Sequence, residues 1–168
     1  HDTVELAEDQ RDILAQILHI AESEKPDAVL IAGDVYDRSV PPAEAVALFD
    51  DFLTVLAAMS PVLLISGNHD SAERLTFAAR LLEKQGVYLG CGLDRVRRPL
   101  TLGDTEFVLL PYLHPSQVRE ETGDEGVRTM DDAVRAALAL APEKRAAHRV
   151  LMAPLFAPAG GVLPERSD

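Results

Sequence analysis

Two short polar turns carry the residues of this chain that are best suited to chemistry. Residues 33–37 read Gly-Asp-Val-Tyr-Asp, and residues 67–70 read Gly-Asn-His-Asp. Asp34 offers two carboxylate oxygens and can bridge two cations, whereas Asn68 offers a neutral carbonyl oxygen. His69 can bind a metal or act as an acid beside a phosphate group. These residue types together favour a site for hard or borderline divalent cations.

Three further residues in the same turns have supporting roles in this interpretation. Asp37 can orient a metal ligand, and Asp70 can orient the ring of His69. Arg38 can reach a phosphate oxygen, although it can equally pair with one of the many carboxylates. A single Gly-Asp after a strand is usually only a turn, so the prediction depends on finding two such turns at matched positions.

The elements around the turns explain why they should meet. Residues 28–32 and 62–65 are short apolar runs typical of buried parallel strands, and residues 41–59 between them have a helical apolar pattern. Successive parallel strands end at the same edge of a sheet, where open α/β sheets bind their ligands. We therefore expect Asp34 and Asn68 to lie close together, with Gly33 and Gly67 allowing the backbone to turn sharply.

The rest of the chain predicts a mixed α/β fold. Apolar periodicity favours helices over residues 3–23, 71–84 and 131–141, the first with Ile13, Leu14, Ile17 and Leu18 on its apolar stripe. Further strands are expected at 87–89, 96–102, 106–110 and 149–153, the first three in a hairpin-like arrangement. Residues 120–126 are expected to form a polar loop, and residues 154–168 a Pro- and Gly-rich tail.

Length and composition indicate one globular domain over residues 1–168. The chain has 168 residues, is 47% hydrophobic and carries a formal net charge of −12. That charge argues against a protein that holds nucleic acid by bulk electrostatics, but it is compatible with an acidic site whose cations meet phosphate. A single Cys fits a reducing compartment, and the absence of a long apolar run or a signal peptide predicts a cytoplasmic protein without membrane association.

The two turns resemble the second and third motifs of the calcineurin-like metallophosphoesterases. Within that superfamily, residues 27–89 and the Leu-Pro-Tyr-Leu sequence at 110–113 are similar to the SbcD family of nuclease subunits. The resemblance implies an α/β/β/α sandwich with two divalent metal ions, manganese or else magnesium. It also implies that Asp34 bridges the metals, that Asn68 binds one of them, and that His69 is catalytic at the scissile phosphate.

The same resemblance implies a biological role. It indicates a DNA exonuclease and endonuclease subunit that acts on DNA ends in repair, recombination and replication. Its partner would be an SbcC-type ATPase, with the nuclease subunit as a homodimer within a heterotetramer. Two alternatives remain open, namely a phosphatase-like phosphoesterase and a non-catalytic scaffold domain.

The chain departs from the family pattern at three motifs. The first motif, Asp-x-His, would precede His1, and the fifth, Gly-His-x-His, would follow Asp168. The fourth motif places a His where this chain has Pro154, which has no side-chain donor atom. We therefore expect an incomplete domain, either a fragment or a degenerate member, that binds metal weakly or not at all.

Two weaker candidates lie outside the turns. His114 follows a predicted strand and can line the site, although a loop His is more often solvated. Arg95, Arg97 and Arg98 form a basic cluster that can touch a DNA backbone, although on a strand such a cluster is more often a solvated edge.

Overall fold

The structure is a computed structural model that describes residues 3–33, 43–67 and 79–154, with side chains described from residue 8 onward. Its helices are α1 (Thr3–Glu24), α2 (Ala43–Met59), α4 (Ala79–Lys84), α5 (Asp94–Arg97), α6 (Pro115–Thr122) and α7 (Met130–Leu138). Its strands are β1 (Val29–Ala32), β2 (Val62–Ile65), β3 (Val87–Gly90), β4 (Leu100–Leu102), β5 (Thr105–Leu109) and β6 (His148–Met152). None of the described helices is both long and apolar enough to cross a membrane.

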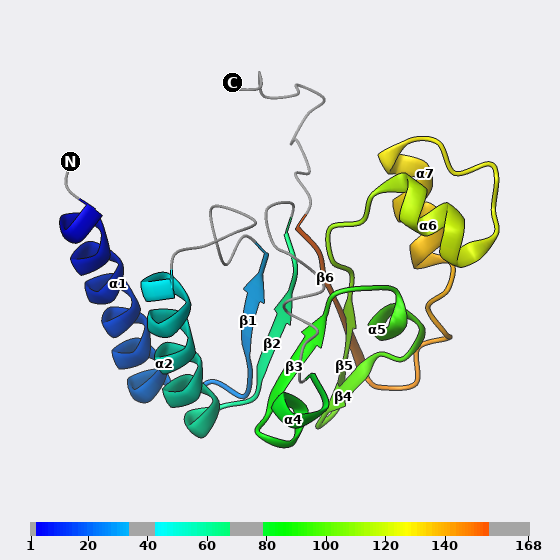
Figure 1. Cartoon of the computed structure of the whole chain (residues 1–168). Helices are drawn as coiled ribbons and strands as arrows, with labels where there is room; N and C mark the ends of the chain where they lie inside the picture. The colour runs from blue at the N-terminus through cyan, green and yellow to red at the C-terminus, as the bar shows by residue number, and fades with distance from the viewer. Residues whose placement is uncertain (1–2, 34–42, 68–78, 155–168) are drawn as a thin grey trace, which may run out of the picture.

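The strands form two sheets (Figure 1). Sheet A has the order β1-β2-β3 and is entirely parallel, with Ala32 opposite Ile65 and Ile65 opposite Gly90 at its carboxyl edge. Sheet B has the order β4-β5-β6, in which β4 and β5 form an antiparallel hairpin and β6 runs parallel to β5. The described strands of both sheets are short, so side chains from the helices complete the burial.

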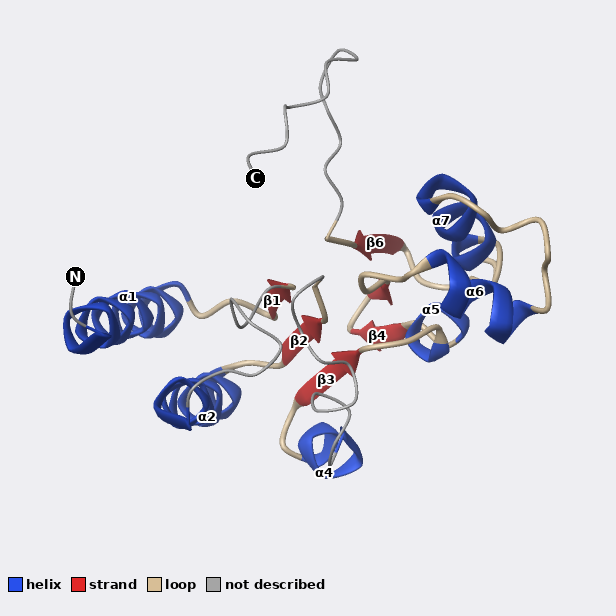
Figure 2. Cartoon of the chain, turned by 45° about the horizontal axis from the view of Figure 1, so that its top comes forward, coloured by secondary structure: helices blue, strands red, loops and turns tan. Residues whose placement is uncertain are grey.

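The sheets and helices stack as an α/β/β/α sandwich, as predicted. Helices α1 and α2 lie on one side, α5, α6 and α7 lie on the other, and the two sheets lie between them (Figure 2). Leu56 of α2 packs with Val62 and Val87 on the outer face of sheet A. Val118 of α6 and Ala133 of α7 pack against the outer face of sheet B.

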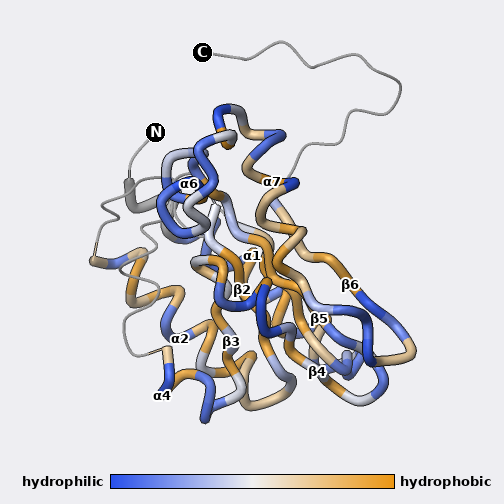
Figure 3. The backbone as a smooth tube through the Cα atoms, turned by 90° about the vertical axis from the view of Figure 1, so that its right-hand side faces the viewer, coloured by the Kyte–Doolittle hydropathy of each residue, from blue (hydrophilic) through white to orange (hydrophobic). Residues whose placement is uncertain are grey.

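A third cluster of apolar side chains fills the space between the sheets. It contains Leu63 and Ile65 from β2, Phe107 and Leu109 from β5, and Met152 from β6. Side chains alternate along a strand, so Val108 of β5 faces the helices instead. Hydrophobic colour accordingly runs along the central strands in Figure 3, while hydrophilic colour gathers at turns and on α6.

Helix α1 has nearly the predicted limits, but only half of its predicted apolar stripe faces the core. Leu14 and Leu18 pack against the α2 and sheet A cluster, whereas Ile13 and Ile17 are 57% and 39% exposed. These two pairs point about 100° apart on a helix, and only one pair can face α2. Strand β1 also differs from the expectation of complete burial, because Leu30 is 43% exposed.

Three predictions between residues 87 and 126 were wrong. Residues 96–102 are not one strand, because α5 ends at Arg97 and β4 begins at Leu100. Val87–Gly90 pairs parallel with β2 rather than forming a hairpin, so it extends the βαβ rhythm by one strand. The predicted polar loop begins only after α6, which starts at Pro115 and ends where Gly123 takes a left-handed conformation with φ 69°.

Candidate metal centre

The ends of three strands meet at one point, which we call the strand-end junction: Gly33, Gly67 and Pro154. Gly33 follows β1 with φ 80°, and a Cβ added to it would lie 2.9 Å from Gly67 Cα and 3.1 Å from Gly67 N. The same added atom would lie 3.4 Å from Pro154 Cβ. Backbone can approach backbone this closely only where no side chain intervenes, so glycine is required at position 33.

Backbone hydrogen bonds hold the end of β2 in place beside the junction. Ser66 N donates to Gly90 O at 3.3 Å, and Tyr112 N donates to Ser66 O at 2.8 Å. The second bond joins sheet A to the segment that leaves β5. Ser66 is buried, so these partners satisfy its main-chain groups where water does not reach. The position of Gly67 is therefore fixed from both sheets.

A second close approach brings the sheets together near the same edge. A Cβ added to Gly90 would lie 2.6 Å from Leu109 Cβ and 3.1 Å from Ile65 Cγ2. Leu110 N donates to Met152 O at 2.9 Å, which holds the ends of β5 and β6 together. The absence of a side chain at Gly90 thus lets sheet B pack closely against the carboxyl edge of sheet A.

The predicted site residues themselves lie outside the described part of the chain. These are Asp34, Asp37, Arg38, Asn68, His69 and Asp70. The structure describes Gly33 and Gly67, the residues directly before Asp34 and Asn68, and brings them into contact. Within residues 3–33, 43–67 and 79–154, no three His, Cys, Asp or Glu side chains gather in a way that could hold a metal ion.

The donor chemistry fits divalent cations, but Pro154, the third member of the junction, contributes no side-chain donor. Strand β6 ends at Met152, and Pro154 lies beside Gly33 at the junction. Proline has neither a side-chain heteroatom nor a backbone N–H, so it cannot ligate through its side chain. The two turns can therefore supply carboxylate, amide and imidazole ligands, whereas Pro154 after β6 cannot supply a side-chain ligand.

His114 has a structural role in the described part of the chain. It is the N-cap of α6, with its Nδ1 accepting from Ser116 N at 3.4 Å and lying 2.8 Å from Ser116 Oγ. Its own N–H donates to Gln117 Oε1 at 3.0 Å, which completes a capping box. These capping contacts explain why a polar residue follows the strand, so no binding role is needed to explain it.

Sequence reasoning did not single out Ser66, although it links the two sheets at the junction. The available signal was its place as a polar residue between the apolar run 62–65 and Gly67. A polar residue at the end of a buried strand has backbone groups that must find partners. The partner Tyr112 is distant in sequence, so the pairing itself was not predictable.

Comparisons with known proteins agree with the motifs and the sandwich. Residues 1–132 match the calcineurin-like phosphoesterase family. The chain is 35% identical over 136 residues to the SbcD subunit of nuclease SbcCD from Staphylococcus epidermidis, an alignment that covers 80% of this chain and 36% of the relative. It is 34% identical over 136 residues to the same subunit from Staphylococcus saprophyticus, with the same coverage of 80% and 36%.

The chain thus spans about a third of the length of these curated relatives, 36% in each case. The family match includes both turns, the strands β1 to β5 and helix α6, so it covers the elements that build sheet A and most of the junction. On this match, and on the sandwich that carries it, the chain belongs to the calcineurin-like phosphoesterase family.

Proposed function

We propose that this chain forms the core of a metal-dependent DNA nuclease domain that hydrolyses phosphodiester bonds. The observation that supports this most strongly is the contact of Gly33 with Gly67, because it joins the two residues that lead into the predicted ligand turns. The named relatives are subunits of a nuclease, and this chain matches them over 80% of its length. Catalytic placement at a sheet's carboxyl edge is the general rule for open α/β sheets.

In this proposal Asp34 and Asn68 hold two divalent cations, manganese or else magnesium. When bound, such ions lower the pKa of water and neutralise charge that develops on the phosphate oxygens. His69 donates a hydrogen bond to the scissile phosphate and moves a proton to the leaving oxygen. Asp70 orients the His69 ring, Asp37 supports a ligand, and the guanidinium of Arg38 binds a phosphate oxygen.

The ligand set within these 168 residues is incomplete in the proposal. Each cation in such a site needs four or more ligands, and Pro154 provides no side-chain donor where the family pattern has a His. We therefore expect this polypeptide alone to bind manganese weakly or not at all. Calorimetric titration that showed two micromolar sites would contradict this expectation.

The partners belong to the proposal as well. We propose that the domain acts on DNA ends in repair, recombination and replication, with an SbcC-type ATPase and as a homodimer within a heterotetramer in the cytoplasm. The relatives are each named as one subunit of nuclease SbcCD, which supports a protein with more than one kind of subunit.

A nuclease assay on the natural protein tests the function. Replacement of His69 by Ala should reduce manganese-dependent degradation of linear duplex DNA by about 100- to 10,000-fold, the range for loss of a general acid. The matched control is His148→Ala, because His148 is an exposed histidine on β6 that faces Asp104 at 3.8 Å. Equal activity in the two variants would refute the role of His69.

The side-chain donor missing at Pro154 favours one alternative, a non-catalytic domain. Replacement of Pro154 by His would place an imidazole at the junction, and we expect it to strengthen manganese binding at least about tenfold if Asp34 and Asn68 are ligands. The control is Pro142→His, because Pro142 lies in the connection before β6 and contacts Arg149 through its carbonyl oxygen. No gain at Pro154 relative to Pro142 would favour the scaffold function.

A further inference from the structure

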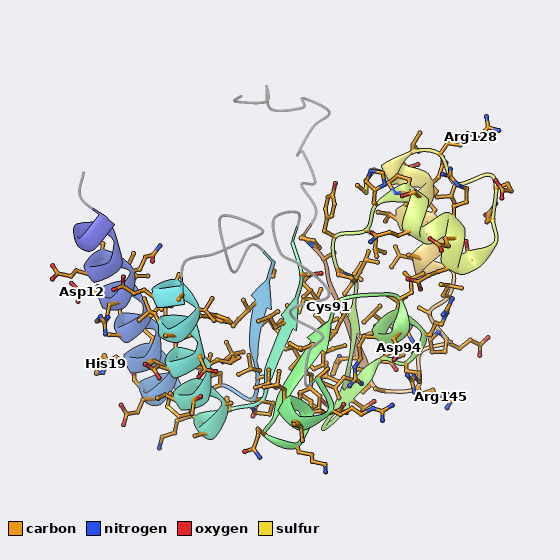
Figure 4. The ribbon with its side chains drawn as sticks, viewed as in Figure 1. Asp12, His19, Cys91, Asp94, Arg128 and Arg145 are labelled. Atoms are coloured by element: carbon orange, nitrogen blue, oxygen red, sulfur yellow. The ribbon has the colours of Figure 1, made fainter. Side chains whose placement is uncertain are left out.

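A hollow lies beside β3, an edge strand of sheet A, between α4 and the segment that runs from β3 into α5. It has a volume of about 510 Å³, and its charged lining residues are Arg80, Glu83, Asp94, Arg95 and Arg98. Cys91 and Asp94, labelled in Figure 4, mark the segment on one side of it. We call this hollow the arginine groove after Arg80, Arg95 and Arg98.

Arg95 is held in position in the groove. Its Nη2 lies 2.9 Å from Glu83 Oε2, and its guanidinium carbon lies 6.0 Å from the centre of the Tyr88 ring. The Arg95 side chain is only 22% exposed, so it has little conformational freedom left to lose on binding a ligand. A guanidinium has five N–H donors in a planar fork, a geometry that matches the oxygens of a phosphate.

The other two arginines are available to an incoming anion. Arg80 is exposed on α4, where an incoming phosphate can reach its guanidinium from solvent. Arg98 pairs with Asp94 one turn away on the surface, where the side chains are 73% and 71% exposed. Exposed pairs of this kind contribute little free energy, so a phosphate can compete with Asp94 for Arg98.

The groove is positively charged although the protein is not. Three arginines face two carboxylates there, on a chain whose formal net charge is −12. A local excess of positive charge on an acidic protein attracts an anion to one place rather than to the whole surface. The arginine groove therefore both attracts an anionic ligand and fixes where on the surface it binds.

The groove begins one strand away from the strand-end junction. Ile65 and Gly90 are partners across β2 and β3, and Ser66 N donates to Gly90 O. Gly67 follows Ser66 and Cys91 follows Gly90, so one end of the groove lies at the carboxyl edge of sheet A that carries the junction. Neighbouring strands lie about 4.8 Å apart, and phosphates recur about every 3.4 Å along the axis of a DNA strand. A strand held at the junction can thus reach the groove within a few nucleotides.

We propose that the arginine groove binds the phosphodiester backbone of DNA beside the candidate metal centre and holds the strand for cleavage. The proposal rests on the proposed nuclease function, because that function supplies the DNA at the same sheet edge. A phosphate backbone fits the groove better than an acidic protein segment. Its three lining arginines present guanidinium forks for small anions, and of its lining side chains only Ala79, Leu89 and Cys91 are apolar, too few to anchor a peptide.

Fluorescence anisotropy of a labelled DNA oligonucleotide with the natural protein tests the proposal. The measurement is made in EDTA, so that binding is read without metal or cleavage. The double variant R80E/R98E should weaken binding by at least about tenfold and make the dependence on salt shallower by about one to two ions. Replacement of Glu83 by Gln should strengthen binding by about two- to fivefold, since it removes a competing carboxylate from the groove.

Arg97→Glu is the matched control. Arg97 is exposed on the same helix α5, and it does not line the groove. This variant should leave DNA affinity within about twofold, since it changes the charge by the same amount as R80E alone but lies outside the groove. An equal loss in R97E and in the R80E single variant would refute the groove, because it would show general charge repulsion. Absence of DNA binding by the unmodified protein in EDTA would refute it too.

One further outcome would assign the groove to a protein partner instead. If R80E/R98E left DNA affinity unchanged but abolished association with an SbcC-type ATPase, the DNA proposal would be overturned. The nuclease function is read separately, from manganese-dependent hydrolysis of bis(4-nitrophenyl) phosphate by the unmodified protein. If the unmodified protein failed to hydrolyse this ester while the variants still differed in DNA binding as expected, the nuclease function would be overturned and the groove would stay supported.

Discussion

Replacement of Gly33 by Ala should destabilise the protein through two separate effects at the strand-end junction. An L-residue at φ 80° costs about 1–2 kcal/mol relative to glycine. The new Cβ would also lie 2.9 Å from Gly67 Cα, a backbone atom that cannot rotate away. Forcing a methyl group into a packed site costs about 1–3 kcal/mol. We expect the free energy of unfolding to fall by about 2–5 kcal/mol in total.

Two other glycines separate these effects. Gly103 has φ 60° and no atom within 4 Å of an added Cβ, so Gly103→Ala should show only the conformational cost of about 1–2 kcal/mol. Gly90 lacks a positive φ but would place a Cβ 2.6 Å from Leu109 Cβ, so Gly90→Ala should show only the steric cost of about 1–3 kcal/mol. The Gly33 variant should be the least stable of the three.

Urea unfolding followed by circular dichroism gives the three free energies. The slope of the free energy against urea concentration must stay constant, so that the differences report stability rather than a change in the unfolding transition. If Gly33→Ala were destabilised no more than Gly103→Ala, within about 0.5 kcal/mol, the close approach of β1 to β2 would be refuted. We would then no longer expect Asp34 and Asn68 to lie close together, because that expectation rests on the contact of Gly33 with Gly67.

Three further perturbations concern sheet B and α7. Arg149→Met should lower the free energy of unfolding by about 3–5 kcal/mol, because Glu106 is buried and its Oε1 lies 2.6 Å from Arg149 Nε. Arg135→Met breaks an exposed pair with Asp131 and should lower it by about 0.5 kcal/mol or less. Urea unfolding of both variants measures the contrast. Thr129→Ala should cost about 1 kcal/mol by the same assay, because its hydroxyl oxygen accepts from Asp132 N at 3.2 Å in a capping box. Hydrogen bonds from the backbone N–H groups of Thr129 and then Arg128 lower the pKa of Asp132, so its stabilising effect is present above the ordinary carboxyl pKa and is lost as the pH falls through the lowered value. Thermal melts at neutral and strongly acidic pH should therefore show a smaller acid-induced loss in Asp132→Ala than in the unmodified protein.

Short-range patterns predicted most of the elements. The continuous apolar run at Val62–Ile65 indicated the limits of β2, since a strand buried on both faces leaves a signal that needs no partner to interpret. Pro61 before this run marked where α2 had to end. The sandwich came from the resemblance rather than from periodicity, because layers depend on contacts between distant residues.

The errors arose where tertiary contacts decided between similar local patterns. The predicted strand 96–102 has apolar residues at Val96, Leu100 and Leu102. Residues 94–97 nevertheless form one helical turn, because Leu93 and Val96 both enter the core beside α6. Strand β3 was assigned to a hairpin because Gly residues follow it, although Gly90 serves the close approach of Leu109. The metal-ligand prediction stays a prediction, because Asp34, Asn68 and His69 lie outside the described residues.

The composition of the strand-end junction has a consequence for how the protein folds. Gly33, Gly67 and Pro154 come from the beginning, the middle and the end of the described chain, so the junction is a contact of high sequence separation. Contacts of this kind form late, since chain entropy must be lost before they are gained. A βαβ unit can bring Gly33 to Gly67 early, but the third member arrives only when β6 has paired with β5 across the whole α6 and α7 segment. We therefore expect the junction to be completed only after both sheets have formed, and not before β6 has left the ribosome on a growing chain.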